Sequence, residues 1–193
     1  MKVVTGMYKN QKLFVPKKRV GIRMTTSLVK EAVIDIFRSV IEGSVLLDIF
    51  AGGGGMGIEF LSNKASRVVF IEGSHQYAGI LKDNLTKLRV EEERYRIICR
   101  DYRSALKVLP GLMKEKFDFI FIDPPYFTDY IKRSIEIISG LDICRKDIVI
   151  MAEHHNKERI EEDIERFIKY QSRKYGTSIL DFWKRNPVWI SGK

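Results

Sequence analysis

Four residues that could do chemistry, Asp123-Pro124-Pro125-Tyr126, directly follow the apolar run 117–122. Such a run is typical of a central strand that is buried on both faces of a parallel sheet. The two prolines end the strand because neither has an N–H group to give, and Pro125 holds Pro124 in an extended conformation. We therefore expect a carboxylate, a backbone carbonyl and an aromatic ring at the carboxyl end of a strand, where open α/β sheets bind ligands.

This combination of groups suits the exocyclic amine of a nucleobase. Such an amine is a poor nucleophile, because its lone pair is delocalised into the ring. The Asp123 carboxylate and the Pro124 carbonyl can accept its two hydrogens, which favours a pyramidal, nucleophilic nitrogen. Tyr126 can stack on the base, a contact worth roughly 1–3 kcal/mol. The simpler alternative is a turn in which the prolines only stop the strand.

A glycine-rich stretch, residues 51–57, forms a second candidate site after the predicted strand 45–50. Gly52, Gly54 and Gly57 match the pattern G-x-G-x-x-G, which fits a dinucleotide as well as other nucleotide cofactors. Acidic residues gather near the predicted strand ends and suit a cationic sulfonium cofactor better than a pyrophosphate: Asp48, Glu72, Asp101 and Asp123. Glu72 is placed to accept hydrogen bonds from both ribose hydroxyls of either cofactor, or it faces water.

The net charge of +9 is concentrated near the N-terminus. Residues 1–30 carry eight basic residues and no acidic one, whereas the remainder is nearly balanced. This asymmetry is the electrostatic pattern of a polyanion-binding protein, although a solvated charged tail is the alternative. The interspersed Thr5, Tyr8 and Asn10 favour nucleic acid. The candidate contacts are Lys9, Lys12, Lys17, Lys18, Arg19 and Arg23.

Hydrophobic periodicity predicts strands that alternate with helices, and hence a mostly parallel α/β sheet. The predicted strands are 45–50, 67–71, 94–99, 117–122 and 147–152, followed by a hairpin of 173–175 and 178–183 around Gly176. The predicted helices are 26–41, 56–63, 75–88, 102–109, 129–139 and 156–170. Residues 1–22 are expected to form a small β extension, so that the main domain covers residues 23–193. Thr25 lies at a helix N-terminus, where backbone N–H groups can line a cofactor pocket.

Composition narrows the class of protein. The 193 residues suffice for one domain, and no apolar run reaches the roughly 18 residues of a membrane span. Two cysteines argue against a disulfide framework and a cysteine-rich zinc site, and they favour the cytoplasm. Adjacent His154 and His155 have no third ligand near them in sequence. We therefore expect no metal, no membrane contact and a monomer.

Several motifs together resemble the bacterial 16S rRNA guanine-N2 methyltransferase family related to RsmD. Asp123-Pro124-Pro125-Tyr126 matches the [Asp/Asn]-Pro-Pro-[Tyr/Phe] motif of amino-methyltransferases, and Asp48-Ile49-Phe50-Ala51-Gly52 resembles motif I of class I S-adenosylmethionine methyltransferases. The stretch 23–32 resembles the family's helix start, with Met24 in place of proline and Leu28 in place of arginine. The opening residues 1–16 resemble its N-terminal extension.

The resemblance implies a Rossmann-like class I fold with a seven-stranded sheet, an antiparallel edge hairpin and helices on both faces. It implies transfer of a methyl group from S-adenosylmethionine to the N2 amine of a guanine in 16S rRNA, within small-subunit particles. The catalytic residues would be Asp123, Pro124 and Tyr126. The cofactor would contact Thr25, Asp48, Phe50, Ala51, Gly52, Gly54 and Glu72, with Asp101 receiving the adenine amine and Tyr102 packing on the adenine. Asp101 is alternatively a helix cap.

Three other functions fit parts of the sequence. An adenine-N6 or cytosine-N4 methyltransferase, acting on RNA or DNA, would use the same four-residue motif. A non-catalytic nucleic-acid-binding protein could keep the fold, although the intact glycine loop argues against this. A dinucleotide-dependent oxidoreductase would bind NAD instead of S-adenosylmethionine.

Overall fold

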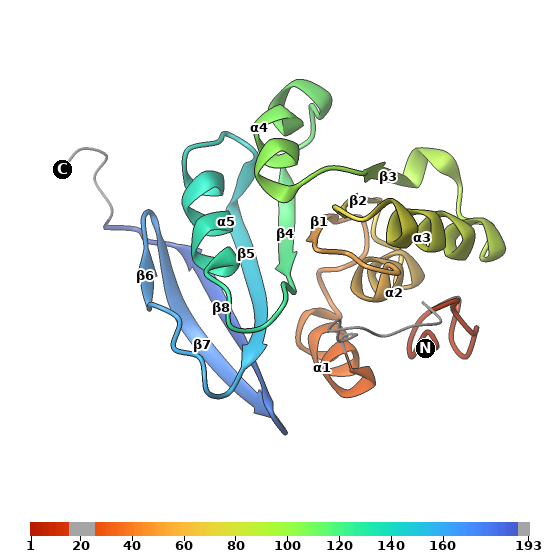
Figure 1. Cartoon of the computed structure of the whole chain (residues 1–193), viewed down its shortest axis with the longest axis horizontal. Helices are drawn as coiled ribbons and strands as arrows, with labels where there is room; N and C mark the ends of the chain where they lie inside the picture. Colours follow the sequence, from red (N-terminus) through yellow and green to blue (C-terminus); the bar gives the residue numbers. More distant parts are fainter. Residues whose placement is uncertain (16–25, 189–193) are drawn as a thin grey trace.

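A computed structural model of the chain describes residues 1–15 and 26–188, which form one sheet with helices on both sides (Figure 1). The described residues contain eight strands in the order β3-β2-β1-β4-β5-β8-β7-β6. The first five strands are parallel neighbours, and the other three pair antiparallel. The predicted α/β class and antiparallel edge are confirmed. The predicted number of seven strands is one too low, because the short β6 (Asp163–Ile164) extends the edge.

In the parallel half of the sheet, neighbouring strands pair along one row of residues near their carboxyl ends. Its strands are β1 (Val45–Ile49), β2 (Arg67–Ile71), β3 (Tyr95–Ile98), β4 (Phe117–Ile122) and β5 (Cys144–His155). Ile49 pairs with both Ile71 and Ile122, and Ile122 pairs with Ala152. The residues after this row therefore emerge together at one edge. The strand order reverses between β1 and β4, which is where open α/β sheets bind ligands.

Two hydrophobic layers cover the sheet, because successive side chains of a strand point to opposite faces. Leu46 and Phe119 face the helices α1 (Ser27–Phe37), α2 (Gly55–Ser62) and α3 (His75–Lys87). Leu47 and Ile120 face α4 (Tyr102–Leu112) and α5 (Tyr130–Ser139). A short 3-10 turn, Glu92–Arg94, precedes β3. Helices on both faces confirm the predicted layering.

The antiparallel half contains β8 (Ser178–Arg185), β7 (Phe167–Tyr175) and β6. The predicted helix over residues 156–170 is wrong, since this stretch consists of turns, β6 and the start of β7. Ile164 pairs with Phe167 across a tight turn in which Glu165 has a φ of +51°. Both apolar side chains are buried. Their three-residue spacing resembled a helical face, but it closes a hairpin instead.

The N-terminal segment, residues 1–15, folds back on itself as a short hairpin-like loop, which agrees with part of the predicted β extension. An antiparallel bridge joins Lys2 to Lys12, the Val3 N–H donates to the Gln11 carbonyl at 3.0 Å, and the Leu13 N–H donates to the Met1 carbonyl at 2.9 Å. The pairing is short, and the N–H groups of Val4 and Thr5 instead donate to the buried Glu59 carboxylate of α2, at 2.8 and 3.1 Å. The loop is thereby anchored on the helical layer. The predicted domain boundary between residues 22 and 23 lies outside the described residues.

A buried ion pair holds this loop in place. The Lys30 Nζ atom lies 2.9 Å from Glu59 Oε1, and both side chains are fully buried. The same Nζ donates to the Lys2 carbonyl at 2.7 Å. A buried charge is tolerated only with such partners, so α1, α2 and the N-terminal segment are fixed as one unit.

Candidate active site

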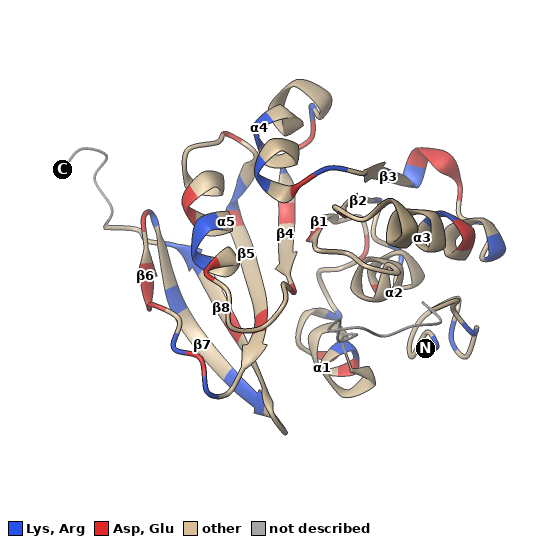
Figure 2. Cartoon of the chain, viewed as in Figure 1, with Lys and Arg blue, Asp and Glu red and all other residues tan. Residues whose placement is uncertain are grey.

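The carboxyl ends of the parallel strands bring the predicted site residues to one edge of the sheet. Phe50 follows the end of β1, Glu72 follows β2 and Asp123 follows β4, each one position beyond the paired row. The Asp123 N–H donates to the Ile49 carbonyl at 3.3 Å, which ties the start of the four-residue motif to the end of β1. Figure 2 shows acidic residues at these strand ends. The glycine loop and the Asp123 motif are therefore neighbours in space.

The glycine loop turns sharply from β1 into α2. Phe50 and Gly52 both have positive φ, at +64° and +55°, and Gly54 has φ +83° as the N-cap of α2. A Cβ on Gly57 would come within 2.1 Å of the Phe70 ring, so close packing of α2 on β2 requires glycine there. A Cβ on Gly52 would meet nothing within 4 Å. Gly52 thus presents bare backbone to open space, as a cofactor-binding turn requires.

Glu72 fastens the glycine loop from the neighbouring strand. Its Oε2 accepts the Gly52 N–H at 2.7 Å, and its Oε1 accepts the Ser74 N–H at 2.8 Å. The alternative of an acid that simply faces water is therefore wrong. A carboxylate oxygen accepts more than one hydrogen bond, so these contacts leave capacity for hydroxyl groups of a ligand.

Asp48 lies beneath the loop and is almost fully buried. Its Oδ2 accepts the Gly57 N–H at 2.9 Å. Burial raises the pKa of this carboxyl to about 7, because a buried charge loses its hydration. The hydrogen bond from the Gly57 N–H opposes this rise in part, and the nearby charge of Glu72 adds to it. Asp48 is therefore a buried acid that holds the first turn of α2, with a proton that is exchangeable near neutral pH.

Asp101 and Tyr102 take different positions at the start of α4. Asp101 caps the helix by accepting the Arg103 N–H at 3.1 Å, as the alternative interpretation predicted. It is about half exposed and pairs with the Arg103 guanidinium, which lowers the pKa of its carboxyl. The Tyr102 ring is buried against Phe50 and Tyr130, at centroid distances of 4.9 and 5.2 Å. The packing of Tyr102 on the adenine of the cofactor stays a prediction.

Tyr130 was not singled out in the sequence. Its ring is stacked on Phe50, with centroids 5.7 Å apart and planes 7° apart. Among the described residues, the buried Tyr102 hydroxyl has no hydrogen-bond partner, which marks a polar group at this edge that a ligand could satisfy. The spacing between Phe50, Tyr102 and Tyr130 carries no periodic signal, because three separate elements supply them.

The four-residue motif lies between β4 and α5. Asp123 is partly buried, Pro124 is buried and Pro125 is exposed. The Thr128 hydroxyl donates to the Pro125 carbonyl at 2.8 Å and folds the loop back on itself. The Tyr126 hydroxyl lies 3.3 Å from the Ser178 hydroxyl and 3.5 Å from Glu153 Oε1. Ser178 also donates to Glu153 Oε1 at 2.8 Å, so β5 and β8 together fix the Tyr126 ring.

Several predicted residues fall outside this edge or outside the described chain. Lys9 and Lys12 are exposed on the N-terminal segment. The remaining predicted RNA contacts and one cofactor contact lie outside the described residues: Lys17, Lys18, Arg19, Arg23 and Thr25. Thr26 caps α1 by accepting the Val29 N–H at 3.3 Å. Ala51 is buried at the start of the glycine loop.

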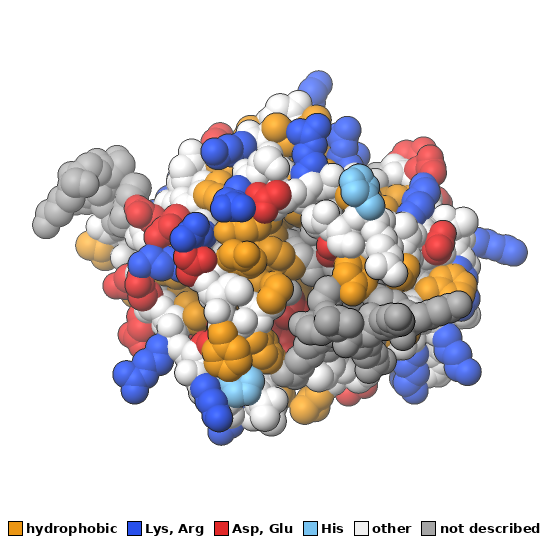
Figure 3. Space-filling view, viewed as in Figure 1, with side chains coloured by type: hydrophobic (Ala, Val, Ile, Leu, Met, Phe, Trp, Pro, Cys, Tyr) orange, Lys and Arg blue, Asp and Glu red, His pale blue; other side chains and the backbone are white. Residues whose placement is uncertain are grey.

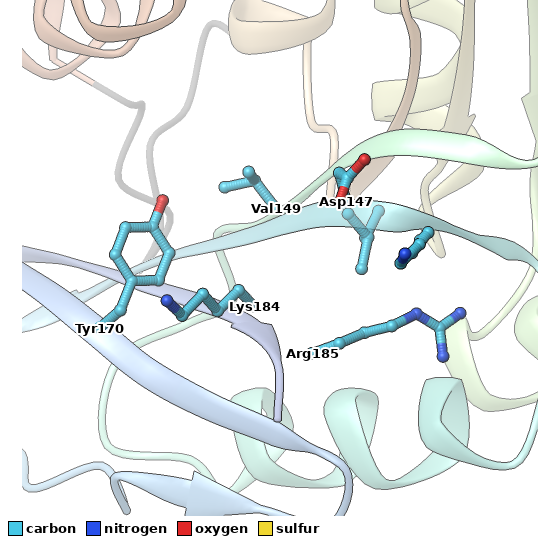
Figure 4. A pocket seen from close by; sticks show the side chains of 7 residues that line it. Asp147, Val149, Tyr170, Lys184 and Arg185 are labelled. Carbon is cyan, nitrogen blue, oxygen red and sulfur yellow. The ribbon is translucent and has the colours of Figure 1, made fainter. Parts of the chain in front are cut away.

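A separate hollow of about 230 Å³ lies at the other end of the sheet, near the start of β5. Its walls include Lys146, Asp147, Val149, Tyr170, Lys184 and Arg185 (Figure 4). None of the predicted site residues lines it. The strand-end edge is therefore the candidate active site, because the converging acids and the glycine loop are there.

Within residues 1–15 and 26–188, no group of three or more His, Cys, Asp or Glu side chains could hold a metal ion. In the same part of the chain, every helix is too short or too polar to cross a bilayer.

Comparison with known proteins gives consistent results. The model of the family described as Conserved hypothetical protein 95 matches residues 1–184. The protein named "Putative rRNA methyltransferase YlbH" of Bacillus subtilis is 28% identical over 96% of this chain and 99% of its own. Ribosomal RNA small subunit methyltransferase D of Haemophilus influenzae is 29% identical over 79% of this chain and 78% of its own.

The fold has a close match among solved structures. The structure of "Putative methyltransferase yhhF from Escherichia coli" has a TM-score of 0.81 and 22% identity, and it covers 96% of this chain and 97% of that one. At this identity the match shows the fold alone. It supports the strand order and layering described above.

Proposed function

The chain belongs to the Conserved hypothetical protein 95 family, whose members are RsmD-like methyltransferases, and on that premise we propose that it methylates the N2 amine of a guanine in 16S rRNA. Relatives are named for methylation of rRNA and of the small ribosomal subunit, which supports rRNA as the substrate. The choice of guanine N2 rests on the family resemblance and on the geometry of the strand-end edge.

The cofactor of this family is S-adenosylmethionine, which when bound supplies a methyl group carried on a positively charged sulfur. The residues at the end of β1 and β2 fit such a molecule. Bare backbone at Gly52 faces open space, and the Glu72 carboxylate holds that backbone in place. We assign Glu72 to the ribose hydroxyls, Asp101 to the adenine amine, and Asp48 with Gly54 to the shape and charge of the loop.

The position of Asp123 beside the end of β1 carries the proposal. Its carboxylate and the Pro124 carbonyl hold the two hydrogens of the target amine, so that the nitrogen lone pair is localised and directed toward the cofactor side. Asp123 takes the proton that the amine loses after methylation. Orientation of the amine supplies most of the rate enhancement, because a correctly held pair of reactants reacts as if at very high concentration.

Tyr126 orients the base itself. Its hydroxyl is held between Ser178 and Glu153, so its ring has a fixed plane on which the guanine can stack. A base inside a helical stack could not reach this edge, and the target nucleotide must therefore turn out of its helix.

The substrate we propose is 16S rRNA within small ribosomal subunit particles, bound by a monomeric cytoplasmic enzyme. Exposed Lys9 and Lys12 support a contact with phosphates. The sequence adds Lys17, Lys18, Arg19 and Arg23 to this basic segment. Cations of this kind contribute affinity without base selection.

The test is Asp123→Ala, measured with labelled S-adenosylmethionine and small-subunit particles from cells that lack the enzyme. We expect turnover to fall by about 10²–10⁴-fold, because the amine loses its oriented acceptor, with cofactor affinity within twofold of wild type. Asp129→Ala is the control, since the exposed Asp129 follows the same loop, directly before α5, and pairs with Arg133 of that helix. Full activity of Asp123→Ala would refute the assignment.

A further inference from the structure

An exposed aromatic residue, Phe127, directly follows the four-residue motif. Its side chain is 67% exposed, and its φ is +59°. A bulky side chain is uncommon in this backbone region, and such conformations persist where surrounding contacts hold them. Figure 3 shows apolar side chains next to a histidine side chain on the face below α5. The protein thus keeps an aromatic ring in water beside the site, at a cost in backbone strain.

Glu158 holds the backbone of Phe127 from the turn after β5. Its Oε1 accepts the Phe127 N–H at 2.8 Å, and its Oε2 accepts the His155 N–H at 2.7 Å. One carboxylate therefore joins the loop after β4 to the end of β5, and the two segments lie side by side in Figure 1. Both bonds are charge-assisted, which makes them stronger than neutral backbone pairs.

The rings of Tyr126, Phe127 and His155 form one cluster. The His155 ring lies 5.3 Å from Tyr126 and 5.2 Å from Phe127, and the Tyr126 and Phe127 rings meet edge to face at 6.3 Å. The Lys157 N–H donates to His155 Nδ1 at 3.1 Å, which fixes the orientation of the imidazole ring. The cluster therefore extends from Tyr126, which we assign to the target base, to the exposed Phe127 ring.

We propose that Phe127 and His155 form a stacking platform for the nucleobase next to the target guanine, with Glu158 as the positioning residue. This inference rests on the proposed function, which supplies an RNA with an extruded base at Tyr126. Aromatic faces bind bases of single-stranded RNA by stacking, and cations nearby bind the connecting phosphates. Exposed Lys157 and Arg159 flank Glu158, and Figure 2 shows basic residues in this turn.

The platform has a consequence for selectivity. The target guanine alone would be a small part of the recognised surface, since the catalytic motif contacts only one base. A second stacked base fixes the direction of the RNA strand across the edge of the sheet. It also requires that the nucleotide beside the target be unpaired, which restricts methylation to a flexible or opened part of the rRNA.

The test compares Phe127→Ala, Phe127→Tyr and Phe127→Leu with small-subunit particles and labelled S-adenosylmethionine. We expect Phe127→Ala and Phe127→Leu to raise the KM for particles by about tenfold or more, with cofactor affinity within twofold of wild type. Phe127→Tyr keeps an aromatic face and should restore KM to within about twofold. An unchanged KM in Phe127→Ala, or equal rescue by Phe127→Leu, would overturn stacking.

A matched pair of variants tests the positioning residue. Glu158→Gln keeps one acceptor oxygen but cannot accept both N–H groups, so KM for particles should rise about threefold or more. Glu161→Gln in the same turn is the control, because Glu161 pairs with the Lys132 side chain. Equal effects in both variants, or an effect confined to thermal unfolding, would overturn the assignment of Glu158.

Two controls separate this inference from the proposed function. Tyr170→Ala removes another exposed aromatic ring, which lies at the separate hollow (Figure 4). It should leave KM for particles unchanged, and an equal rise there would contradict a local platform. If wild type itself transfers no methyl group to the particles, the proposed function fails; if it does and Phe127→Ala matches it, only the platform fails.

Discussion

The two sides of the strand-end edge are built in different ways. On the side that we assign to the cofactor, at β1 and β2, the carboxyl groups of Asp48 and Glu72 accept backbone N–H groups of the glycine loop. On the side that we assign to the base, at β4 and β5, the Tyr126 hydroxyl and the Phe127 backbone are held by hydrogen bonds, and the Phe127 ring is exposed. In the proposed function, the cofactor would therefore meet acidic groups held against the backbone, and the RNA would meet aromatic rings.

This contrast implies that the two sides can be impaired separately. Changes to Asp48 or Glu72 should lower cofactor affinity or stability and spare RNA affinity. Changes to the rings of Tyr126 and Phe127 or to the basic N-terminal segment should lower RNA affinity and spare cofactor affinity.

Replacing Lys30 by Met should lower the free energy of unfolding by about 3–5 kcal/mol, because the buried Glu59 charge loses its partner. The pair joins α1 to α2, the helix that follows the glycine loop, and it holds the N-terminal segment. Urea unfolding would measure the change. The double variant Lys30→Met with Glu59→Gln should recover part of the loss, whereas a single-variant loss below about 1 kcal/mol would contradict a structural role for the pair.

Replacing Glu72 by Ala should weaken S-adenosylmethionine binding by about 10–100-fold. The ribose hydroxyls that we assign to Glu72 lose a charged acceptor, and one hydrogen bond to a charged group contributes about 1.5–3 kcal/mol, which corresponds to about 10–100-fold in affinity. Isothermal titration calorimetry gives the affinity, and Glu72→Gln should show a smaller loss because it keeps one acceptor oxygen. RNA affinity should stay within twofold; a comparable loss there would break the separation of the two sides.

The raised pKa of Asp48 should make stability depend on pH. A carboxyl with a pKa of about 7 in the folded protein and 3.8 in the unfolded chain binds its proton more tightly when folded. Stability from this group is therefore full below about pH 4 and is lost as pH rises to about 7, by roughly 2 kcal/mol between pH 5 and 7. Asp48→Asn keeps an oxygen for the Gly57 N–H and should flatten that profile. Identical profiles in both proteins would contradict the buried-acid interpretation.

Neutralising Lys9 and Lys12 should weaken RNA binding and reduce its salt dependence. Each cation that contacts a single-stranded phosphate contributes about 0.7 to the slope of log affinity against log salt, so the slope should fall by about 1.4. Binding to 16S rRNA at several salt concentrations measures this slope. The segment packs on the cofactor side, yet cofactor affinity should not change; an unchanged slope would remove these two residues from the RNA contact.

Local signals in the sequence predicted much of this fold. Strands β2 and β4 were predicted with their observed ends. Both predictions depend only on a short apolar run of neighbouring residues. The glycine loop, Glu72 and Asp123 were placed near each other because parallel strands end at one edge.

Contacts between distant residues could not be predicted in this way. The sequence carries no signal that Lys30 and Glu59 form a pair, and only packing shows that both side chains are fully buried. Glu158 lay within a predicted helix, so its bonds to Phe127 and His155 had no sequence signal. The spacing of Ile164 and Phe167 fits a helix and a hairpin equally well, and tertiary burial decides between them.

Nucleoside analysis of small-subunit particles, after methyl transfer from labelled S-adenosylmethionine, directly tests whether the protein methylates guanine N2 in 16S rRNA. The particles come from cells that lack the enzyme, and particles from wild-type cells serve as the control for saturated sites. We expect label in N2-methylguanosine of 16S rRNA, in wild type and not in Asp123→Ala. Label in N6-methyladenosine or N4-methylcytidine would contradict the guanine assignment, and cofactor binding without transfer would contradict rRNA as the substrate.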